Sequence, residues 1–549
     1  MNQVSISGAQ FRDMIVVGAA LLERNRQAID ALNVFPVPDG DTGTNMTMTM
    51  QSAVKEMRSI PDDADVSTVA DALSMGALRG ARGNSGVILS QLFRGFSRAC
   101  KGASVMDAQL LSSALTLGCE AAYKAVMKPK EGTILTVSRM IAEEASALAE
   151  RGANVYGLVD AMIESGERAL AKTPELLPVL KEAGVIDSGG KGLLTIYKGF
   201  KLSLDGDEIP DLPEAAETEQ AASGGAAAEM EGVPEESIEF GYCTEFFIVH
   251  LNPAFREADL DVFRDHLMKL GNSVVVAYDA DIVKVHVHSN APGKVLQMAL
   301  RFGELDHLKI ENMREQNREL QAERKRNEKE FAMVAVSAGD GIESVFHELM
   351  VDYVIAGGQT MNPSIDTIAG AIRKVNARNV FVLPNNSNII MAAQQAAELV
   401  SCNVIVLPTK TIPQGIAAAM AFNGAVDVSA NERAMTEAFR EVVSGAVTYA
   451  VRNTKFHGED IAEGDIIGLM DNDLCCVGTA VDGVTAELLR KMVEKRGEPD
   501  AAITVFYGEQ VDEANAEALM EQLQEEYPDA EFIVQRGGQP LYYYYLSVE

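Results

Sequence analysis

From Phe11 onward, apolar residues recur every three or four positions, which is the spacing of one face of a helix. The first such series contains Met14, Ile15, Leu21, Leu22, Ala28, Ile29 and Leu32. Similar series continue to about Gly199, whereas strand-like alternation is scarce there. This pattern predicts an all-helical domain over residues 1–202, with glycine-rich loops at residues 39–45, 80–86 and 184–192.

The pattern changes over residues 239–325. Strand-like segments (CTEFFIVHL, NSVVVAY and IVKVHVHS) here accompany two helical stretches, DLDVFRDHLMKL and KVLQMALRFG. These segments predict a small α/β middle domain. The charged run at residues 312–330, NMREQNRELQAERKRNEKE, predicts an exposed helix or connector.

Over residues 331–549, apolar strands alternate with helices. The strands are FAMVAVSA, YVIAGG, NVFVLPNN, NVIVLPTK, DIIGLMD and AITVFYGE. Such alternation predicts an α/β domain with parallel sheets covered on both faces. A charged helical break near residues 430–463 suggests two lobes, and the final LYYYYLSVE alternates too little to be assigned.

Length, charge and local composition add three expectations. A chain of 549 residues exceeds a single core, so several domains are expected. Its net charge of -33 repels phosphodiester backbones and anionic lipid surfaces, so we expect neither nucleic acid binding nor membrane docking. Residues 203–238 are acidic and alanine-rich and contain no Lys or Arg, which predicts a flexible linker.

The cysteines and the N-terminus bear on the compartment. The six cysteines have no regular spacing, which argues against a disulfide framework. The N-terminus has no basic leader ahead of an apolar core, and no apolar run reaches about 18 residues. We therefore expect a cytoplasmic protein that does not span a membrane.

The segment NVFPVPDGDTGTNM, residues 33–46, is the first that suggests chemistry. Asp39 and Asp41 are two positions apart in a glycine-containing turn, which directs both carboxylates into one small space. Such a pair favours a cation between its members, and Mg²⁺ binds carboxylates together with phosphate oxygens. DG and DTG are also ordinary turn sequences, so a purely structural role stays open.

A second loop, GARGNSG at residues 80–86, directly precedes the apolar helical stretch VILSQLF. Small residues there let backbone N–H groups approach a phosphate, which a helix N-terminus also favours. Neither this loop nor GVIDSGGKG at residues 184–192 fits the G-x-x-x-x-G-K-[ST] motif of P-loop enzymes. Each loop alone is equally typical of a turn between packed helices.

Taken together, PDGDTGTNM, GARGNSG, EGTILTV and AGVIDSGGKGL resemble the nucleotide-binding domain of the dihydroxyacetone kinase L family. The longer segment NVFPVPDGDTGTNM is similar to the fatty acid kinase branch of that family. The resemblance extends over essentially the whole chain. It implies a multidomain fold: an all-α helical-barrel nucleotide-binding domain, a small α/β middle domain and an α/β C-terminal domain similar to DegV-type lipid-binding proteins.

The resemblance also implies roles for single residues. Asp39 and Asp41 match metal-binding carboxylates, and Asn33 is the further Mg²⁺ ligand that it suggests. The matching nucleotide-contacting positions are Thr44, Asn45, Gly83, Asn84, Ser85, Gly86, Thr133, Leu135, Asp187, Gly189 and Gly190.

The reaction implied is transfer of the ATP γ-phosphoryl group to a fatty acid carboxylate, giving an acyl phosphate. The acid would be presented by a separate DegV-type carrier, and the resemblance suggests a homodimer. A carboxylate is already ionised at pH 7, so this reaction needs positioning and charge neutralisation, and no general base. A kinase of a small ketone or polyol, or a non-catalytic regulator or lipid-binding scaffold, are the alternatives.

The middle domain contains a possible zinc site. In VKVHVHS, strand alternation places His286 and His288 on one face together with Lys284. Cys243 on the preceding strand could add a thiolate, and the resemblance agrees with this set. The fourth ligand stays open between His307, Glu245, water and a second protein chain, and half-exposed histidines beside a buried cysteine are the alternative.

Three loops of the C-terminal domain lie at predicted strand ends: GGQTMNPS (357–364), PNNSN (384–388) and PTKTIPQG (408–415). They resemble the DegV-like loops that hold a fatty acid carboxylate. A docking scaffold for the carrier, a lipid pocket of the domain itself and a structural role are the three interpretations.

Overall fold

A computed structural model describes residues 5–33, 40–126, 129–206, 238–253, 255–256, 258–279, 282–358, 362–450, 453–456, 459–497 and 501–549. The chain forms two compact units. One comprises Met1–Glu214 and Glu330–Glu549, and the other comprises Ala215–Lys329. Nearly all of the predicted linker lies outside the described residues. Within the described residues, no helix is both long and apolar enough to cross a membrane.

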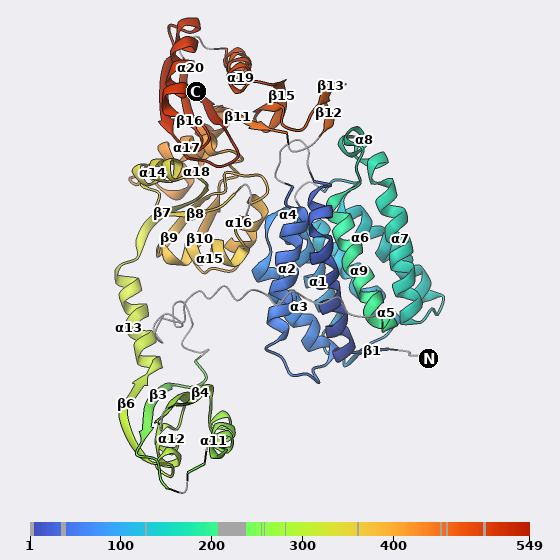
Figure 1. The fold of residues 1–549 in the computed structure, drawn as a ribbon, viewed down its shortest axis with the longest axis vertical. Helices are drawn as coiled ribbons and strands as arrows, with labels where there is room; N and C mark the ends of the chain where they lie inside the picture. The colour runs from blue at the N-terminus through green and yellow to red at the C-terminus, as the bar shows by residue number, and fades with distance from the viewer. Residues whose placement is uncertain are drawn as a thin grey trace. The chain divides into compact units, whose positions relative to one another are not determined.

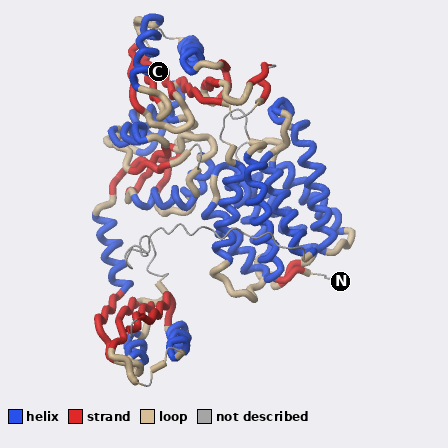
Figure 2. Tube along the Cα trace, in the orientation of Figure 1, coloured by secondary structure: helices blue, strands red, loops and turns tan. Residues whose placement is uncertain are grey.

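The N-terminal domain is helical, as the sequence predicts (Figures 1 and 2). Its helices are α1 (Gly8–Asp30), α2 (Thr42–Met57), α3 (Val66–Gly80), α4 (Gly83–Cys100), α5 (Ala108–Ala125), α6 (Ile134–Glu150), α7 (Val155–Leu176), α8 (Pro178–Ala183) and α9 (Ser188–Asp205). Two short strands that the pattern did not predict, β1 (Ile6–Ser7) and β2 (Val105–Met106), pair antiparallel beside them.

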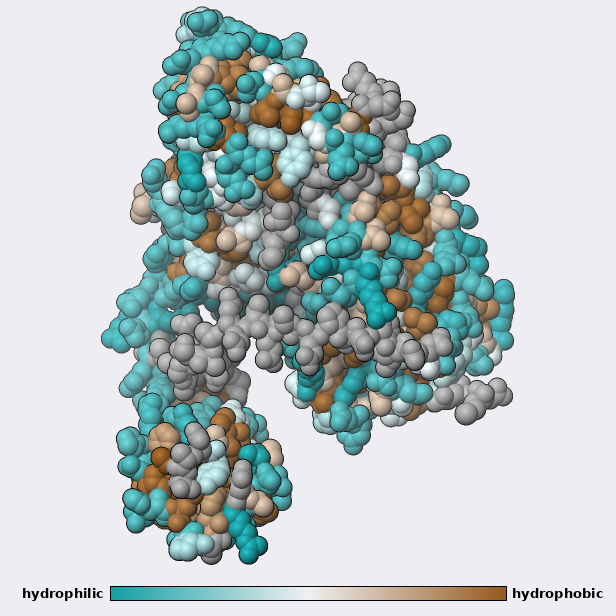
Figure 3. All heavy atoms as spheres, viewed as in Figure 1, coloured by the Kyte–Doolittle hydropathy of each residue, from teal (hydrophilic) through white to brown (hydrophobic). Residues whose placement is uncertain are grey.

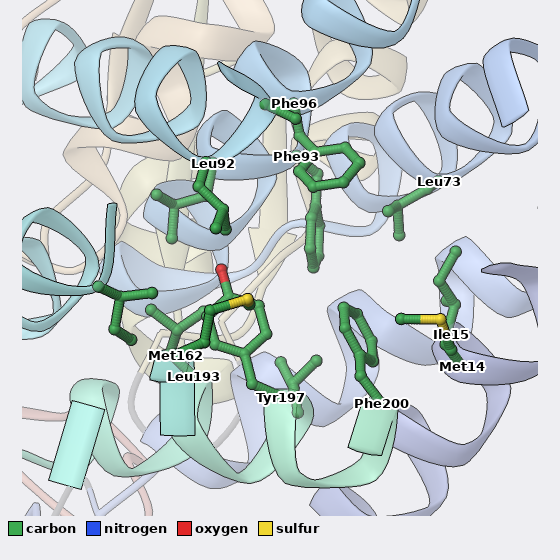
Figure 4. Close-up of a cluster of buried hydrophobic side chains, with 14 of the residues drawn as sticks. Met14, Ile15, Leu73, Leu92, Phe93, Phe96, Met162, Leu193, Tyr197 and Phe200 are labelled. Carbon is green, nitrogen blue, oxygen red and sulfur yellow. The ribbon is translucent and has the colours of Figure 1, made fainter. Parts of the chain in front are cut away.

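The apolar faces of these helices meet in one core (Figure 4). The rings of Phe11 from α1 and Phe96 from α4 stack with their centroids 5.5 Å apart. Tyr197 and Phe200 of α9 enter the same cluster. Burial of each such ring contributes about 1.5–3 kcal/mol, so the core fixes the positions of the helix ends that carry the predicted loops.

The middle unit is an antiparallel sheet of order β4-β5-β3-β6 with helices, which confirms the α/β prediction. The strands are β3 (Tyr242–Val249), β4 (Gly271–Asp279), β5 (Ile282–Ser289) and β6 (Glu304–Asn312), and the helices are α11 (Asp259–Met268), α12 (Pro292–Ala299) and α13 (Met313–Arg326). The sequence pattern missed β6 because this edge strand is mostly exposed and has no clear apolar alternation.

The C-terminal domain begins with a sheet of order β10-β9-β7-β8. Its strands are β7 (Lys329–Ser337), β8 (Tyr353–Ala356), β9 (Ala377–Leu383) and β10 (Asn403–Val406), with helices α14 (Asp340–Glu348), α15 (Ile365–Lys374), α16 (Ile390–Ala397), α17 (Ile412–Met420) and α18 (Val428–Glu441). The β7/β8 and β9/β10 pairs are parallel, as predicted.

A second sheet follows, of order β15-β14-β11-β18-β16-β17. It consists of β11 (Val443–Tyr449), β14 (Ile466–Met470), β15 (Asp473–Gly478), β16 (Ala502–Tyr507), β17 (Glu531–Arg536) and β18 (Tyr544–Val548), with α19 (Val481–Arg496) and α20 (Glu513–Glu526). Separately, β12 (Thr454–Phe456) pairs antiparallel with β13 (Glu459–Ile461).

The expectation of parallel pairing is wrong for most of this second sheet. Only β16 and β17 pair parallel, whereas the other pairs are antiparallel. A two-residue turn with left-handed φ at Asp471 and Asn472 joins β14 to β15, and such a short connection permits only antiparallel pairing. The unassigned LYYYYLSVE segment contains the interior strand β18, whose residues are all buried, so no alternation is visible.

Candidate functional site

The first predicted loop lies against the end of α1 and the start of α2. The Asp30 carboxylate accepts hydrogen bonds from the Thr44 backbone N–H (3.0 Å) and the Thr44 hydroxyl (2.8 Å), so it caps α2. Asp41 occupies the cap position itself but makes no side-chain cap hydrogen bond. A Cβ on Gly43 would lie 2.3 Å from the Arg26 carbonyl oxygen, so the loop fits α1 only with glycine there.

Hydrogen bonds connect this loop to the start of α9. The Asn33 amide donates to the Thr42 hydroxyl (2.8 Å), and the Ser188 hydroxyl donates to the same oxygen (3.2 Å). Asp187 caps α9 by accepting the Gly190 N–H at 2.6 Å. Desolvation of its inward-facing carboxylate raises the pKa of Asp187 to about 6. The structure thus brings two loops together that are separated by about 150 positions in the sequence.

The EGTILTV segment completes this side of the site. Thr133 caps α6 through the Leu135 N–H, and the Ile134 N–H donates to the Asp187 carboxylate. A Cβ on Gly189 would meet the Ile134 side chain at 3.2 Å, which is a tight contact. The predicted residues Thr133, Leu135 and Asp187 therefore lie together at the adjoining N-termini of α6 and α9.

The GARGNSG loop packs on the start of α2. Gly83 has a φ of +56°, and a Cβ there would lie 2.5 Å from Nδ2 of the buried Asn45. A Cβ on Gly86 would lie 2.5 Å from the Thr49 hydroxyl oxygen. Ser85 lies in the first turn of α4. Small residues are required here because α2 and the start of α4 approach each other closely.

A residue of the C-terminal domain also reaches this site. The Asn362 amide nitrogen lies 2.5 Å from Oδ2 of Asp41, and the Arg82 guanidinium donates to the Asn362 carbonyl oxygen at 3.0 Å. Asn84 donates to Oδ1 of Asn388 at 3.0 Å. Sequence reasoning identified none of these cross-domain contacts, because no local pattern relates positions about 300 residues apart.

Asp30 was missed as well, because no local pattern distinguishes it from other carboxylates near the end of a helix. It is the last residue of α1 and lies nine positions before Asp39. In the structure this carboxylate accepts two hydrogen bonds from Thr44. Asp39 lies outside the described residues, so its predicted role stays a prediction.

The described residues fit a magnesium ion. The side-chain atoms that could coordinate it are hard oxygens, which Mg²⁺ prefers. They belong to the nearly buried carboxylate of Asp41 and to the amide of Asn33. In addition, Oδ1 of the buried Asn362 has no hydrogen-bond partner among these residues, although the other end of this amide bonds Asp41. A buried acceptor without a donor is costly, and a cation or its bound water would satisfy it.

The second candidate site lies on the middle-unit sheet. Cys243 on β3 is directly opposite His288 on β5, and His286 lies two positions before His288 on the same face. Their ligand atoms all lie within 4.8 Å of one another. The Nε2 atoms of the two histidines are 3.2 Å apart, and the Cys243 sulfur is 3.9 Å from Nδ1 of His286.

This geometry fits zinc. Two imidazole nitrogens on a tetrahedral zinc, each bonded at about 2.0–2.1 Å, are about 3.3 Å apart. Glu245 lies directly opposite His286 and pairs with Lys284 at 3.0 Å. His307 pairs with Asp306 at 3.1 Å. The structure therefore brings the three predicted ligands together and leaves the fourth open.

Comparison with protein families covers most of the chain. Residues 36–201 match the DAK2 domain, residues 239–320 match the middle domain of FakA-like fatty acid kinase proteins, and residues 332–549 match their C-terminal domain. Protein YloV of Bacillus subtilis is 46% identical over 562 residues, which span 100% of both chains. The chain belongs to the FakA-like fatty acid kinase family.

Other relatives of this FakA-like chain are similar over its full length. A Staphylococcus aureus protein is 41% identical over 553 residues, covering 99% of each chain. Among solved structures, DegV of Bacillus subtilis, described as a fatty acid binding protein, aligns with 40% of this chain and 100% of its own (11% identity, TM-score 0.29). The dihydroxyacetone kinase of C. freundii aligns with 40% of this chain and 48% of its own (11% identity, TM-score 0.31).

These findings confirm the predicted family and the predicted multidomain fold, with a helical domain of the dihydroxyacetone kinase type and an α/β C-terminal domain. They identify the chain as a member of a kinase family. The residue roles and the substrate are taken up below as proposals.

Proposed function

We propose that this chain binds ATP and Mg²⁺ in its helical domain and transfers the γ-phosphoryl group to a fatty acid carboxylate. The observation that carries this proposal is the convergence of three glycine-containing loops around Asp41 at the starts of α2, α4 and α9. The family assignment supports the fatty acid as acceptor.

One set of residues would bind the metal ion, and another would bind the phosphates. Asp41 with Asn33, together with Asp39, would hold the metal ion, which supplies charge neutralisation on the phosphates. Gly83 and Gly86 let the start of α4 pack closely on α2, and the main-chain N–H groups at the α4 N-terminus would bind a phosphate. The start of α9, capped by Asp187, would enclose the nucleotide from the other side.

The transfer itself requires little further chemistry. A carboxylate oxygen forms a bond to the γ-phosphorus while the bond to the bridging oxygen of ADP breaks, giving an acyl phosphate and ADP. The acceptor is already ionised at neutral pH, so no proton acceptor is needed, and catalysis depends on positioning and electrostatics.

The acid would be delivered by a separate DegV-type fatty-acid-binding protein. The FakA-like family is defined as one component of a fatty acid kinase, which supports a second component with its own role. Without a carrier, the apolar chain would need an apolar tunnel beside a strongly polar loop site. The C-terminal domain would then provide the surface on which the carrier docks.

The middle unit is proposed to bind zinc and to mediate a homodimer. The Cys243, His286 and His288 cluster supports the metal. Apolar side chains visible on the surface of this unit support association (Figure 3). The large exposed ones are Val262, Met268, Val275, Tyr278, Ile282, Leu300, Leu308 and Ile310. Contact with a second copy of the chain would remove such apolar surface from water, which favours association.

The deciding experiment mixes the purified protein with Mg-ATP, oleate or palmitate, and a DegV-type carrier, and traps acyl phosphate with hydroxylamine. Hydroxamate that requires both proteins is the expected result. ATP consumption without hydroxamate, but stimulated by dihydroxyacetone, would favour a kinase of a small ketone or polyol. No ATP consumption with an active carrier would favour a nucleotide-bound regulator.

A further inference from the structure

The hydrogen bond between Asn362 and Asp41 joins two residues that are far apart in the sequence. Asp41 belongs to the nucleotide loop of the helical domain, and Asn362 belongs to the strand-end loop before α15. Both side chains are buried, at 8% and 1% exposure. Their 2.5 Å hydrogen bond therefore connects two domains in a place that excludes water.

The orientation of the Asn362 amide follows from the charge of its partner. Its nitrogen faces the Asp41 carboxylate, because the opposite orientation would place two acceptors against each other at 2.5 Å. The amide oxygen then points away from Asp41 and has no partner among the described residues. An amide whose nitrogen donates to a metal-binding carboxylate, and whose own oxygen lies nearby, is suited to positioning that carboxylate.

Main-chain contacts hold Asn362 in place. Arg82 and Ser364 form an isolated antiparallel bridge, and the Ile365 N–H donates to the Ala81 carbonyl oxygen at 3.1 Å. The Arg82 guanidinium donates to the Asn362 carbonyl oxygen. The loop that carries Asn362 is thus hydrogen-bonded to the GARGNSG loop itself, within three residues of the Asn362 amide.

A wider interface supports this loop. Ala81 and Val87 of the helical domain share a buried apolar cluster with Ile365, Ile368 and Ile389. Beside it, three polar pairs connect α4 and the region of α16: Asn84 with Asn388 (3.0 Å), Gln91 with Gln395 (3.0 Å) and Arg94 with Glu398 (3.7 Å).

We infer that Asn362 of the C-terminal domain is a positioning residue for the metal-binding carboxylate of Asp41. This inference rests on the proposed function. The amide donates to one carboxylate oxygen of Asp41 and so fixes the orientation of that carboxylate, and its own Oδ1, which no described residue satisfies, would accept a hydrogen bond from water bound to the metal ion. Metal binding in the helical domain therefore depends on the C-terminal domain being docked against it.

The test replaces Asn362 with Leu, which has a similar shape but no hydrogen-bonding groups, in the full-length protein. Mn²⁺ binding is measured by equilibrium dialysis, with and without a non-hydrolysable ATP analogue. Loss of an outer partner of a metal ligand typically weakens metal affinity about 10- to 100-fold, and we expect a loss in this range. Turnover should recover at saturating Mg²⁺, which a misfolded variant would not show.

Gln395→Leu is the matched control, because it removes an amide pair from the same interface without touching Asp41. We expect its Mn²⁺ affinity to match the wild type. Unchanged or tighter Mn²⁺ binding in Asn362→Leu would overturn the inference while leaving the proposed function intact. Absence of Mn²⁺ and nucleotide binding in the wild type would instead overturn both.

Discussion

The two candidate sites are built in opposite ways. The Cys243, His286 and His288 cluster lies on two neighbouring antiparallel strands, whose pairing register alone brings the side chains together. The nucleotide site gathers residues from α1, α2, α4, α9 and the loop before α15, which only tertiary packing can align. A strand site tolerates movement elsewhere in the chain, whereas the loop site depends on every element that contributes to it.

The largest effect should come from Asp41→Ala. This change removes a metal-binding carboxylate from the nucleotide site, so we expect Mg-ATP turnover to fall by about 100-fold or more. Turnover and the thermal unfolding midpoint are measured together. Asp205→Ala, which removes an exposed carboxylate that pairs with Lys201, should leave turnover intact. Normal turnover in Asp41→Ala would remove the metal assignment.

A smaller and more local effect is expected from His286→Ala. The wild type should contain about one zinc ion per chain, as a Cys-His-His set would bind, and the variant should contain almost none. Metal content is measured on protein purified without chelators. His266→Ala, which removes an exposed ring on α11 outside the cluster, should retain the metal. Equal metal content in wild type and His286→Ala would refute the zinc site.

The smallest effect concerns Asp187, whose folded pKa of about 6 lies above the ordinary 3.8. The folded state then binds more protons than the unfolded state between these values, so Asp187 destabilises the protein increasingly as pH rises from about 4 to 6. Asp187→Asn keeps the cap and removes this penalty, which is at most about 3 kcal/mol. We expect its unfolding midpoint, relative to wild type, to increase from pH 4 to pH 7.

Asp65→Asn is the matched comparison with the opposite sign. The Thr68 hydroxyl and N–H lower the pKa of Asp65, so its stabilisation is present above the ordinary pKa and is lost as pH falls. Relative to wild type, Asp65→Asn should therefore lose stability as pH rises from 3 to 5. If the stability of both variants relative to wild type changed in the same direction with pH, the pKa shift of Asp187 would not be the cause of the change.

The sequence predicted most of the fold where periodicity was strong. Helical spacing identified the N-terminal domain, and alternation in VKVHVHS placed both histidines on one face. The apolar pattern missed β18, whose residues are all buried, and β6, whose residues are mostly exposed, because neither strand alternates between apolar and polar positions. The pairing direction in the second sheet depends on turn length, which apolar strand patterns do not report.

The nucleotide site was predictable only in part. The loop composition indicated phosphates and a cation, because glycines and close carboxylates are local features of the sequence. Asp30 as a cap and Asn362 as a partner of Asp41 depend on which segments pack together. Such contacts carry no local signature, so a single sequence could not reveal them.

The 321-residue separation of Asp41 and Asn362 has a consequence for biosynthesis. At a bacterial rate of about 5–20 residues per second, roughly 16–64 s pass between the synthesis of the two partners. The helical domain can fold first, since N-terminal domains generally fold as units during translation. A nascent chain would thus contain the nucleotide loops before the Asn362 amide has been synthesised. It would reach its full metal affinity only after the C-terminal domain has been made.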